Sequence, residues 1–97
     1  MKFEWNEEKA ESNLKKHGVS FEEASTIFGD LSAKMFYDEE HSFDEIREFV
    51  IGYSEMNRLL IVHFTERENK QIRIITARKP TNFECEDYEE NESRRRK

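Results

Sequence analysis

Several side chains between residues 58 and 80 have the types and spacing needed to bind and act on a phosphate group. His63, Thr65 and Arg67 occur at every second position, which places all three on one face of a strand. Histidine has an unperturbed pKa near 6.5 and can act as a base at neutral pH, although a strand histidine packed against a helix is equally common. Arg67 and Arg78 carry planar guanidinium groups suited to two parallel hydrogen bonds with phosphate oxygens. The alternatives are a solvated turn residue for Arg67 and a salt bridge to the acidic C-terminal region for Arg78.

The distribution of charge favours the same segment. The chain has 97 residues and a net charge of −6, which by itself argues against a nucleic-acid ligand. Residues 58–80, however, hold six lysines and arginines against two acids, whereas residues 38–48 and 81–92 hold six acids each. Because charge location matters more than the total, this basic segment is compatible with nucleic-acid binding, and the two acidic segments should repel it.

Cysteine usage and hydropathy exclude several other classes. Cys85 is the single cysteine, so no internal disulfide can form, and we expect it to be a buried helix residue. No CxxC or paired His/Cys spacing occurs, and we expect no metal site and no cofactor. No apolar run approaches the roughly 20 residues that span a bilayer, and KFEWNEEKAE is unlike a signal peptide. We therefore expect a cytoplasmic protein without a membrane role.

The N-terminal third has the spacing of a short strand and two helices. Residues 2–5 alternate in the manner of a strand, and Asn6 is a suitable helix cap. A helix is expected over residues 7–17, with Gly18 as its left-handed stop. Its packed stripe should contain Ala10, Asn13, Leu14 and His17. A second helix should follow over residues 20–29, where Ser20 and Glu23 form a capping box.

From residue 33 the pattern is that of strands. Four segments rich in β-branched and aromatic residues fit this description: 33–37, 48–53, 58–66 and 71–78. The short connectors SEMN and ENK join the last three into an antiparallel meander. Pro80 ends the last strand, and a capping box at Thr81 and Glu84 begins a final helix that carries Tyr88.

The order β-α-α-β-β-β-β-α predicts an α+β fold, with helices on one side of an antiparallel meander sheet. A chain of this length is too short for two cores, so residues 1–92 should form a single domain. Residues 93–97 are basic and should be a frayed tail. The register of the last hairpin decides whether Arg73 shares the face of Arg67, because a slip of one residue moves a side chain to the other face.

Two long stretches of the sequence together resemble the BrnT toxins. The opening KFEWNEEKAESNLKKHGVSFEEASTIFGD is similar to the family's short strand ending in Trp, followed by a helix closed by Lys-His-Gly-Val-x-Phe. RLLIVHFTERENKQIRIITARK is similar to its paired strands, with Thr-x-Arg in the first and Arg-Ile-Ile-x-Ala-Arg in the second. The chain departs from the family pattern at Glu68, where Gly is usual, and at Asn6, where Asp is commoner.

The resemblance implies a RelE/ParE-like fold and an endoribonuclease that arrests growth until an antitoxin binds. The implied antitoxin is BrnA-like, with a ribbon-helix-helix segment that dimerises, so that two toxins bind one antitoxin dimer in a heterotetramer. Operator DNA would then be contacted only through the antitoxin. The acidic segments of this chain agree with DNA binding by the antitoxin alone, because specific DNA-binding surfaces are strongly positive.

An RNA substrate gives the candidate residues specific roles. In metal-free cleavage the ribose 2′-hydroxyl attacks the adjacent phosphate, which requires a proton acceptor, a proton donor and cations around phosphorus. We expect Arg67 and Arg78 to stabilise the charge and His63 to accept the proton. The RNA-binding candidates are Lys15, Lys16, Arg73, Lys79 and Tyr88. Lys15 and Lys16 can instead complement the helix dipole, and Tyr88 can instead belong to the core.

Two other classes of function fit the sequence. One is a non-catalytic interaction module, whose basic hairpin holds an acidic partner. The other is a ParE-like topoisomerase inhibitor that does not touch RNA. A shared fold does not separate these classes, since the difference lies in a few side chains.

Overall fold

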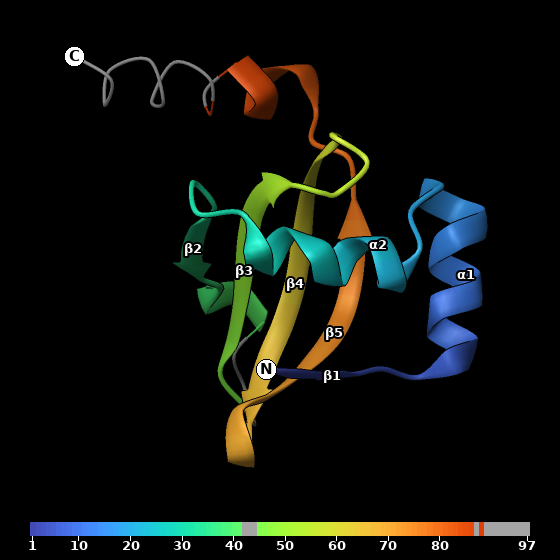
Figure 1. Ribbon diagram of the computed structural model, residues 1–97, viewed down its shortest axis with the longest axis vertical. Helices are drawn as coiled ribbons and strands as arrows, with labels where there is room; N and C mark the ends of the chain where they lie inside the picture. The colour runs from blue at the N-terminus through green and yellow to red at the C-terminus, as the bar shows by residue number, and fades with distance from the viewer. Residues whose placement is uncertain (42–44, 87, 89–97) are drawn as a thin grey trace.

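The computed structural model of the chain describes residues 1–41, 45–86 and 88, and consists of two helices packed on one five-stranded sheet (Figure 1). The main elements are β1 Lys2–Glu4, α1 Glu7–His17, α2 Phe21–Thr26, β2 Lys34–Tyr37, β3 Arg47–Tyr53, β4 Leu59–Arg67 and β5 Gln71–Arg78. Residues 82–86 are also helical. The predicted class and element order are confirmed. The tail at 93–97 lies outside the described residues, and none of the helices within them is long and apolar enough to cross a membrane.

Both N-terminal helices begin where their capping residues predict, and α1 also ends at the predicted residue. The Asn6 side chain accepts a hydrogen bond from the backbone N–H of Lys9 at 3.1 Å, and Ser20 accepts one from Glu23 at 3.0 Å. Gly18 adopts φ 70°, the left-handed conformation that closes α1. The second helix is shorter than expected, because a 3₁₀ turn, η1 Ile27–Gly29, replaces its last α-helical turn.

The sheet has the strand order β1-β5-β4-β3-β2. Strands β3, β4 and β5 form the predicted antiparallel meander, and β2 extends it. The one parallel pair joins β1 to the start of β5, with Glu4 opposite Arg73. Sequence reasoning did not place β1 in the sheet, and this pairing brings an acidic side chain to the basic hairpin.

A bulge in β5 fixes the register of the last hairpin. His63 is opposite Thr76 and Phe64 is opposite Ile74, so Ile75 has no partner in β4. Beyond the bulge, Thr65 is opposite Arg73. Residues directly opposite each other in a sheet share a face. Arg73 therefore lies on the same face as Arg67.

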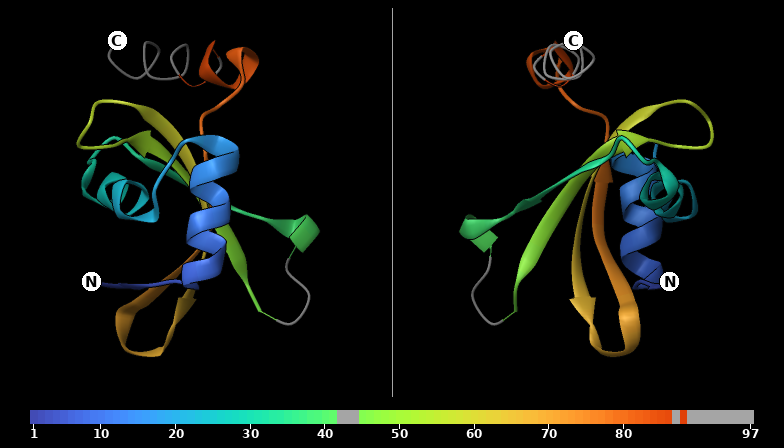
Figure 2. Two further views of the ribbon diagram at one scale, coloured as in Figure 1. Left: turned by 90° about the vertical axis from the view of Figure 1, so that its right-hand side faces the viewer. Right: turned by 60° about the vertical axis from the view of Figure 1, so that its left-hand side comes forward.

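Helix α2 crosses one face of the sheet, which we call the covered face, and α1 lies beside the β5 edge (Figure 1 and Figure 2). The buried core between the helices and the sheet consists of Val19, Phe21, Ala24, Ile27, Val50, Leu60, Val62, Phe64, Ile72, Ile74 and Ala77. We call the opposite face the open face. Because side chains alternate along a strand, β4 directs Phe64 into the core and His63 to the open face.

The packing of α1 differs from the predicted stripe. Leu14 is 50% exposed, whereas Asn13 is 7% exposed. The Asn13 amide donates to the carbonyl oxygens of Val19 and Ala77 at 2.9 and 2.8 Å and accepts from the Ala77 N–H at 3.1 Å. Strand β1 pairs only with residues 71–73 of β5, so Asn13 hydrogen-bonds the edge of β5 as a neighbouring strand would. A polar contact thus replaces the apolar one expected from Leu14.

Candidate functional site

His63 lies on the open face between a carboxylate and a hydroxyl group. Its Nε2 atom is 3.9 Å from Oδ2 of Asp38, and its Nδ1 atom is 3.2 Å from Oγ1 of Thr76. The His63 side chain is 26% exposed, and the Asp38 side chain is 11% exposed. This arrangement orients the imidazole and leaves it accessible from solvent.

Two aromatic rings extend from His63 across the open face. The ring of Phe49 lies 5.4 Å from the imidazole, and Phe36 stacks on Phe49 at a centroid distance of 5.1 Å. Phe36 is 43% exposed. An exposed aromatic face of this kind can stack on a nucleobase, since every base presents a π-face.

Arg67 and Arg73 share a single acidic partner on the open face. Arg67 Nε is 3.4 Å from one oxygen of Glu4, and Arg73 Nη1 is 3.7 Å from the other. A second carboxylate, that of Glu45, is 3.9 Å from Arg67. These pairs are long and partly exposed, the Arg67 side chain being 47% accessible. Each is therefore expected to contribute no more than about 1 kcal/mol.

Arg78 has a closer partner. Its two terminal nitrogens donate to both oxygens of Glu84, at 2.9 and 3.0 Å. This contact with Arg78 lowers the pKa of Glu84 to about 2 and raises the pKa of Arg78. Glu84 also accepts from the Thr81 N–H at 2.8 Å, which completes the predicted capping box. The structure therefore shows Arg78 in the salt bridge that was the alternative to a phosphate-binding role.

The remaining candidates lie away from His63. Tyr88 is 4% exposed and donates to the Ser32 carbonyl oxygen at 3.1 Å, so it is packed rather than open to a base. Lys79 is exposed at the end of β5. Lys15 lies beside Glu8 and Glu11 on α1. Lys16 borders a pocket between α1 and β5.

Arg58, the first residue of the basic segment, has a structural role. Its guanidinium pairs with Glu23 of α2, and the Nε–Oε2 distance is 2.8 Å. Ser54 donates to the same carboxylate at 2.7 Å. The hydrogen bond from Arg58 is the main reason that the pKa of Glu23 is lowered. This pair joins α2 to the start of β4. Arg58 is therefore not available to bind a ligand.

The structure thus brings His63, Arg67, Arg73 and Arg78 to one face and leaves Lys15 and Lys16 on α1. Tyr88 packs against Tyr53 and Lys34. Sequence reasoning missed Asp38, Thr76 and Glu4. Thr76 could have been found from the sequence, because it is two residues before Arg78 in the same strand and therefore lies on the same face. Asp38 and Glu4 could not, because their positions depend on the pairing of strands that are distant in the sequence. In the described part of the chain, no three His, Cys, Asp or Glu side chains are grouped as a metal site requires.

Comparison with known proteins connects this fold to one family. The family described as "Ribonuclease toxin, BrnT, of type II toxin-antitoxin system" matches residues 5–84. The crystal structure of the Brucella abortus ribonuclease toxin BrnT is similar, with a TM-score of 0.67 and 29% sequence identity. The match covers 84% of this chain and 99% of the Brucella chain. No curated protein sequence matches the chain.

Proposed function

The chain belongs to the BrnT family of ribonuclease toxins of type II toxin-antitoxin systems, and we propose that the open face around His63 is the surface that cleaves RNA. The observation that carries this proposal is the position of His63, held between Asp38 and Thr76 on the face that α1 and α2 leave uncovered. Arg67 and Arg73 lie on the same face and supply positive charge.

The reaction is an internal transfer at phosphorus that requires no metal ion. The ribose 2′-hydroxyl loses its proton to His63 and attacks the adjacent phosphorus, while the bond from phosphorus to the 5′-oxygen breaks and that oxygen takes up a proton from water. The products are a 2′,3′-cyclic phosphate and a 5′-hydroxyl end. The Asp38 carboxylate, 3.9 Å from the imidazole, stabilises the imidazolium that forms.

Arg67 and Arg73 are the best-placed phosphate ligands. An incoming phosphate replaces Glu4, and the exchange costs little because the Glu4 contacts are 3.4 and 3.7 Å long and partly exposed. The planar guanidinium groups then form charge-assisted hydrogen bonds to the non-bridging oxygens. Arg78 is a weaker candidate, because it must first release its two-point contact with Glu84.

A toxin of a type II system has a cognate antitoxin, and we assign that partner to the open face. The edge strand β2 supports this assignment, because its residue Phe36, opposite Phe49 on the open face, is 43% exposed. Met35 and Tyr37, on the other face of the same strand, are 54 and 55% exposed. An exposed edge strand with apolar side chains is suited to pairing with another chain. The antitoxin is expected to be BrnA-like, to dimerise, to carry two toxins and to provide all operator binding.

Purified protein incubated with RNA and a chelator tests the proposed activity. The expected result is cleavage with 2′,3′-cyclic phosphate ends. Cleavage that occurs only after Mg²⁺ is restored contradicts the metal-free mechanism. Intact RNA combined with blocked DNA supercoiling favours a topoisomerase inhibitor instead, and intact RNA with unaffected supercoiling favours an interaction module.

The partner is tested by copurification with the neighbouring gene product, followed by mass measurement and gel shifts. The expected result is a heterotetramer in which only the antitoxin-containing sample retards operator DNA. Operator binding by this chain alone contradicts the assignment.

A further inference from the structure

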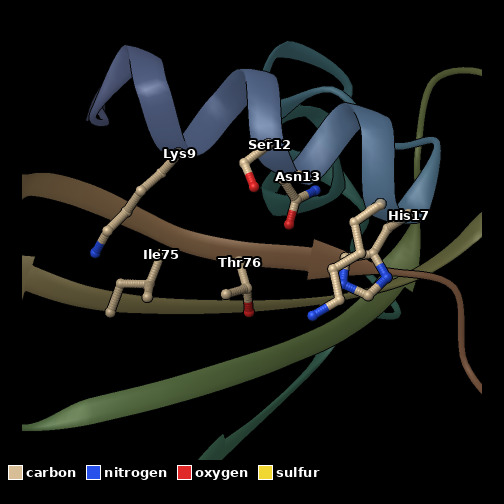
Figure 3. Close-up of a pocket in the computed structure, with 7 residues that line it drawn as sticks. Lys9, Ser12, Asn13, His17, Ile75 and Thr76 are labelled. Atoms are coloured by element: carbon tan, nitrogen blue, oxygen red, sulfur yellow. The ribbon is translucent and has the colours of Figure 1, made fainter.

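We infer that a pocket between α1 and β5 binds a backbone phosphate of the RNA away from the scissile bond, an inference that rests on the proposed ribonuclease function (Figure 3). The pocket has a volume of about 250 Å³. Its lining includes Lys9, Ser12, Lys16, His17, Ile75 and Thr76. Figure 3 shows Lys9 and His17 at opposite ends, with Ser12 and Thr76 between them.

The side of α1 that borders this pocket carries two cations. Lys9, Ser12 and Lys16 are three and four residues apart, so they lie on one helix face, and all three are exposed at the rim of the pocket. Among the described residues, neither Lys9, Lys16 nor His17 forms an ion pair or a side-chain hydrogen bond. Their donors are therefore available to a ligand, and an anion is the ligand they suit.

The helix dipole does not account for all of these cations. Lys16 and His17 lie in the last turn of α1, where positive charge complements the dipole. Lys9 lies near the first turn, where the same dipole disfavours a cation. A ligand that contacts both ends of the pocket explains Lys9 as well as Lys16.

The pocket is preformed, because α1 cannot shift easily relative to β5. Asn13 lies in the same helix face and uses its amide to bind both backbone groups of Ala77. These hydrogen bonds are buried and set the spacing between the helix and the strand. Because the helix is already fixed in place, a bound phosphate has to order only the side chains around it.

Thr76 connects the pocket to the proposed cleavage centre. It lines the pocket, and its hydroxyl oxygen is 3.2 Å from Nδ1 of His63. A phosphate in the pocket therefore lies one side chain away from the proposed base. An RNA strand that presents one phosphate to Arg67 and Arg73 can place another here, beyond the edge of β5. In a chain with net charge −6, such a second positive site helps hold a polyanion.

The test compares two double variants that remove the same charge. One is Lys9→Gln with Lys16→Gln, in the pocket. The matched control is Lys2→Gln with Lys34→Gln, two lysines that lie outside both the pocket and the basic segment 58–80. Binding of a single-stranded DNA oligonucleotide of about 12 nucleotides, which lacks the 2′-hydroxyl and is not cleaved, is measured over a range of salt concentrations. The pocket variant should lower the salt slope by about 0.7 relative to the control, as expected for one lost phosphate contact.

Cleavage kinetics then separate binding from chemistry. On an RNA of about 12 nucleotides, the pocket variant should raise KM about tenfold relative to the control and leave kcat nearly unchanged, because the contact is equally strong in the ground and transition states. On a dinucleotide, which cannot reach the pocket, the two variants should cleave equally. Equal KM values on the long RNA, or an equal loss on both substrates, overturn the inference.

Two further outcomes keep the proposals distinct. If neither protein cleaves RNA, the proposed function fails, and the salt slope with single-stranded DNA still decides whether the pocket binds phosphate. If nucleic-acid binding is unchanged while affinity for the antitoxin falls, the inference is overturned and the pocket belongs to a protein interface.

Discussion

Phe64 and His63 are adjacent in β4, yet they belong to two regions of opposite character. Phe64 is fully buried on the covered face and makes an edge contact with Phe28 at a centroid distance of 5.1 Å. His63 lies on the open face among a carboxylate, a hydroxyl and an aromatic ring. In a small domain with one core, one face of a strand can therefore form the core while the other face carries the residues proposed for catalysis.

The ion pairs divide along the same lines. The Glu23–Arg58 pair, at the covered face, includes a carboxylate that is 5% exposed and is reinforced by Ser54. The pairs of Glu4 with Arg67 and Arg73 on the open face are longer and more exposed. The first arrangement holds helix to sheet, whereas the second is easily exchanged for a ligand. Substitutions on the two faces should therefore separate stability from activity.

The largest effect on activity is expected at His63. Loss of a general base typically lowers the rate by about 10² to 10⁴-fold, so His63→Gln should do so, with a loss of stability of no more than about 1.5 kcal/mol from its hydrogen bond with Thr76. The wild-type rate should fall as pH drops and the imidazole becomes protonated, and the variant should lose that dependence. Single-turnover cleavage between pH 5 and pH 8 provides the measurement. A variant with wild-type rate and pH profile would reduce His63 to a packing residue.

The neighbouring change should have the opposite signature. Phe64→Ala removes a fully buried ring from the centre of the core and should destabilise the fold by about 3 to 5 kcal/mol. Urea denaturation of both β4 variants measures this directly. The comparison of the two faces fails if Phe64→Ala is tolerated as well as His63→Gln.

Arg67 should show an intermediate effect confined to activity. Arg67→Ala is expected to lower the cleavage rate by about 10²-fold, by analogy with loss of one donor to a developing oxyanion. Arg67→Lys keeps the charge and loses the planar fork, so it should recover only part of the rate. Full activity of the lysine variant would mean that charge alone suffices. Arg73→Ala should resemble Arg67→Ala, since the two side chains share Glu4.

The smallest effect concerns Glu84 and is expected in stability alone. Its folded pKa is about 2, below the ordinary 4.5, so its pair with Arg78 stabilises the fold above pH 4.5 and loses this contribution as pH falls toward 2. Because the pair is one-third exposed, the contribution should not exceed about 1 kcal/mol. The difference in unfolding free energy between wild type and Glu84→Gln should be constant above pH 4.5 and vanish near pH 2. If the difference in unfolding free energy stayed constant down to pH 2, the Glu84–Arg78 pair could not be the cause of that difference.

Local signals explain what the sequence predicted well. The caps at Asn6 and Ser20 and the left-handed Gly18 involve residues within a few positions of each other, and all three appear as expected. The meander also follows from short connectors. The face on which Arg73 lies depends on the β5 bulge at Ile75. No feature of the sequence indicates this bulge.

Non-local contacts explain what the sequence did not predict. Asp38 reaches His63 across 25 positions, and Glu4 meets the basic hairpin only because β1 pairs in parallel with β5. Asn13 was placed in the packed stripe of α1, but its partner Ala77 is 64 residues away. Arg78 was expected to bind phosphate, and the structure instead favours the salt bridge with Glu84 that was its alternative.

The most direct test of the open face as the cleavage surface is a crystal structure of the protein with an RNA oligonucleotide that carries a 2′-deoxy sugar at the cleavage position. We expect a phosphate to replace Glu4 between Arg67 and Arg73, and the 2′-carbon of the modified sugar to lie beside the His63 imidazole. RNA bound over α1 and α2, or on the open face without contact to His63, would contradict the account.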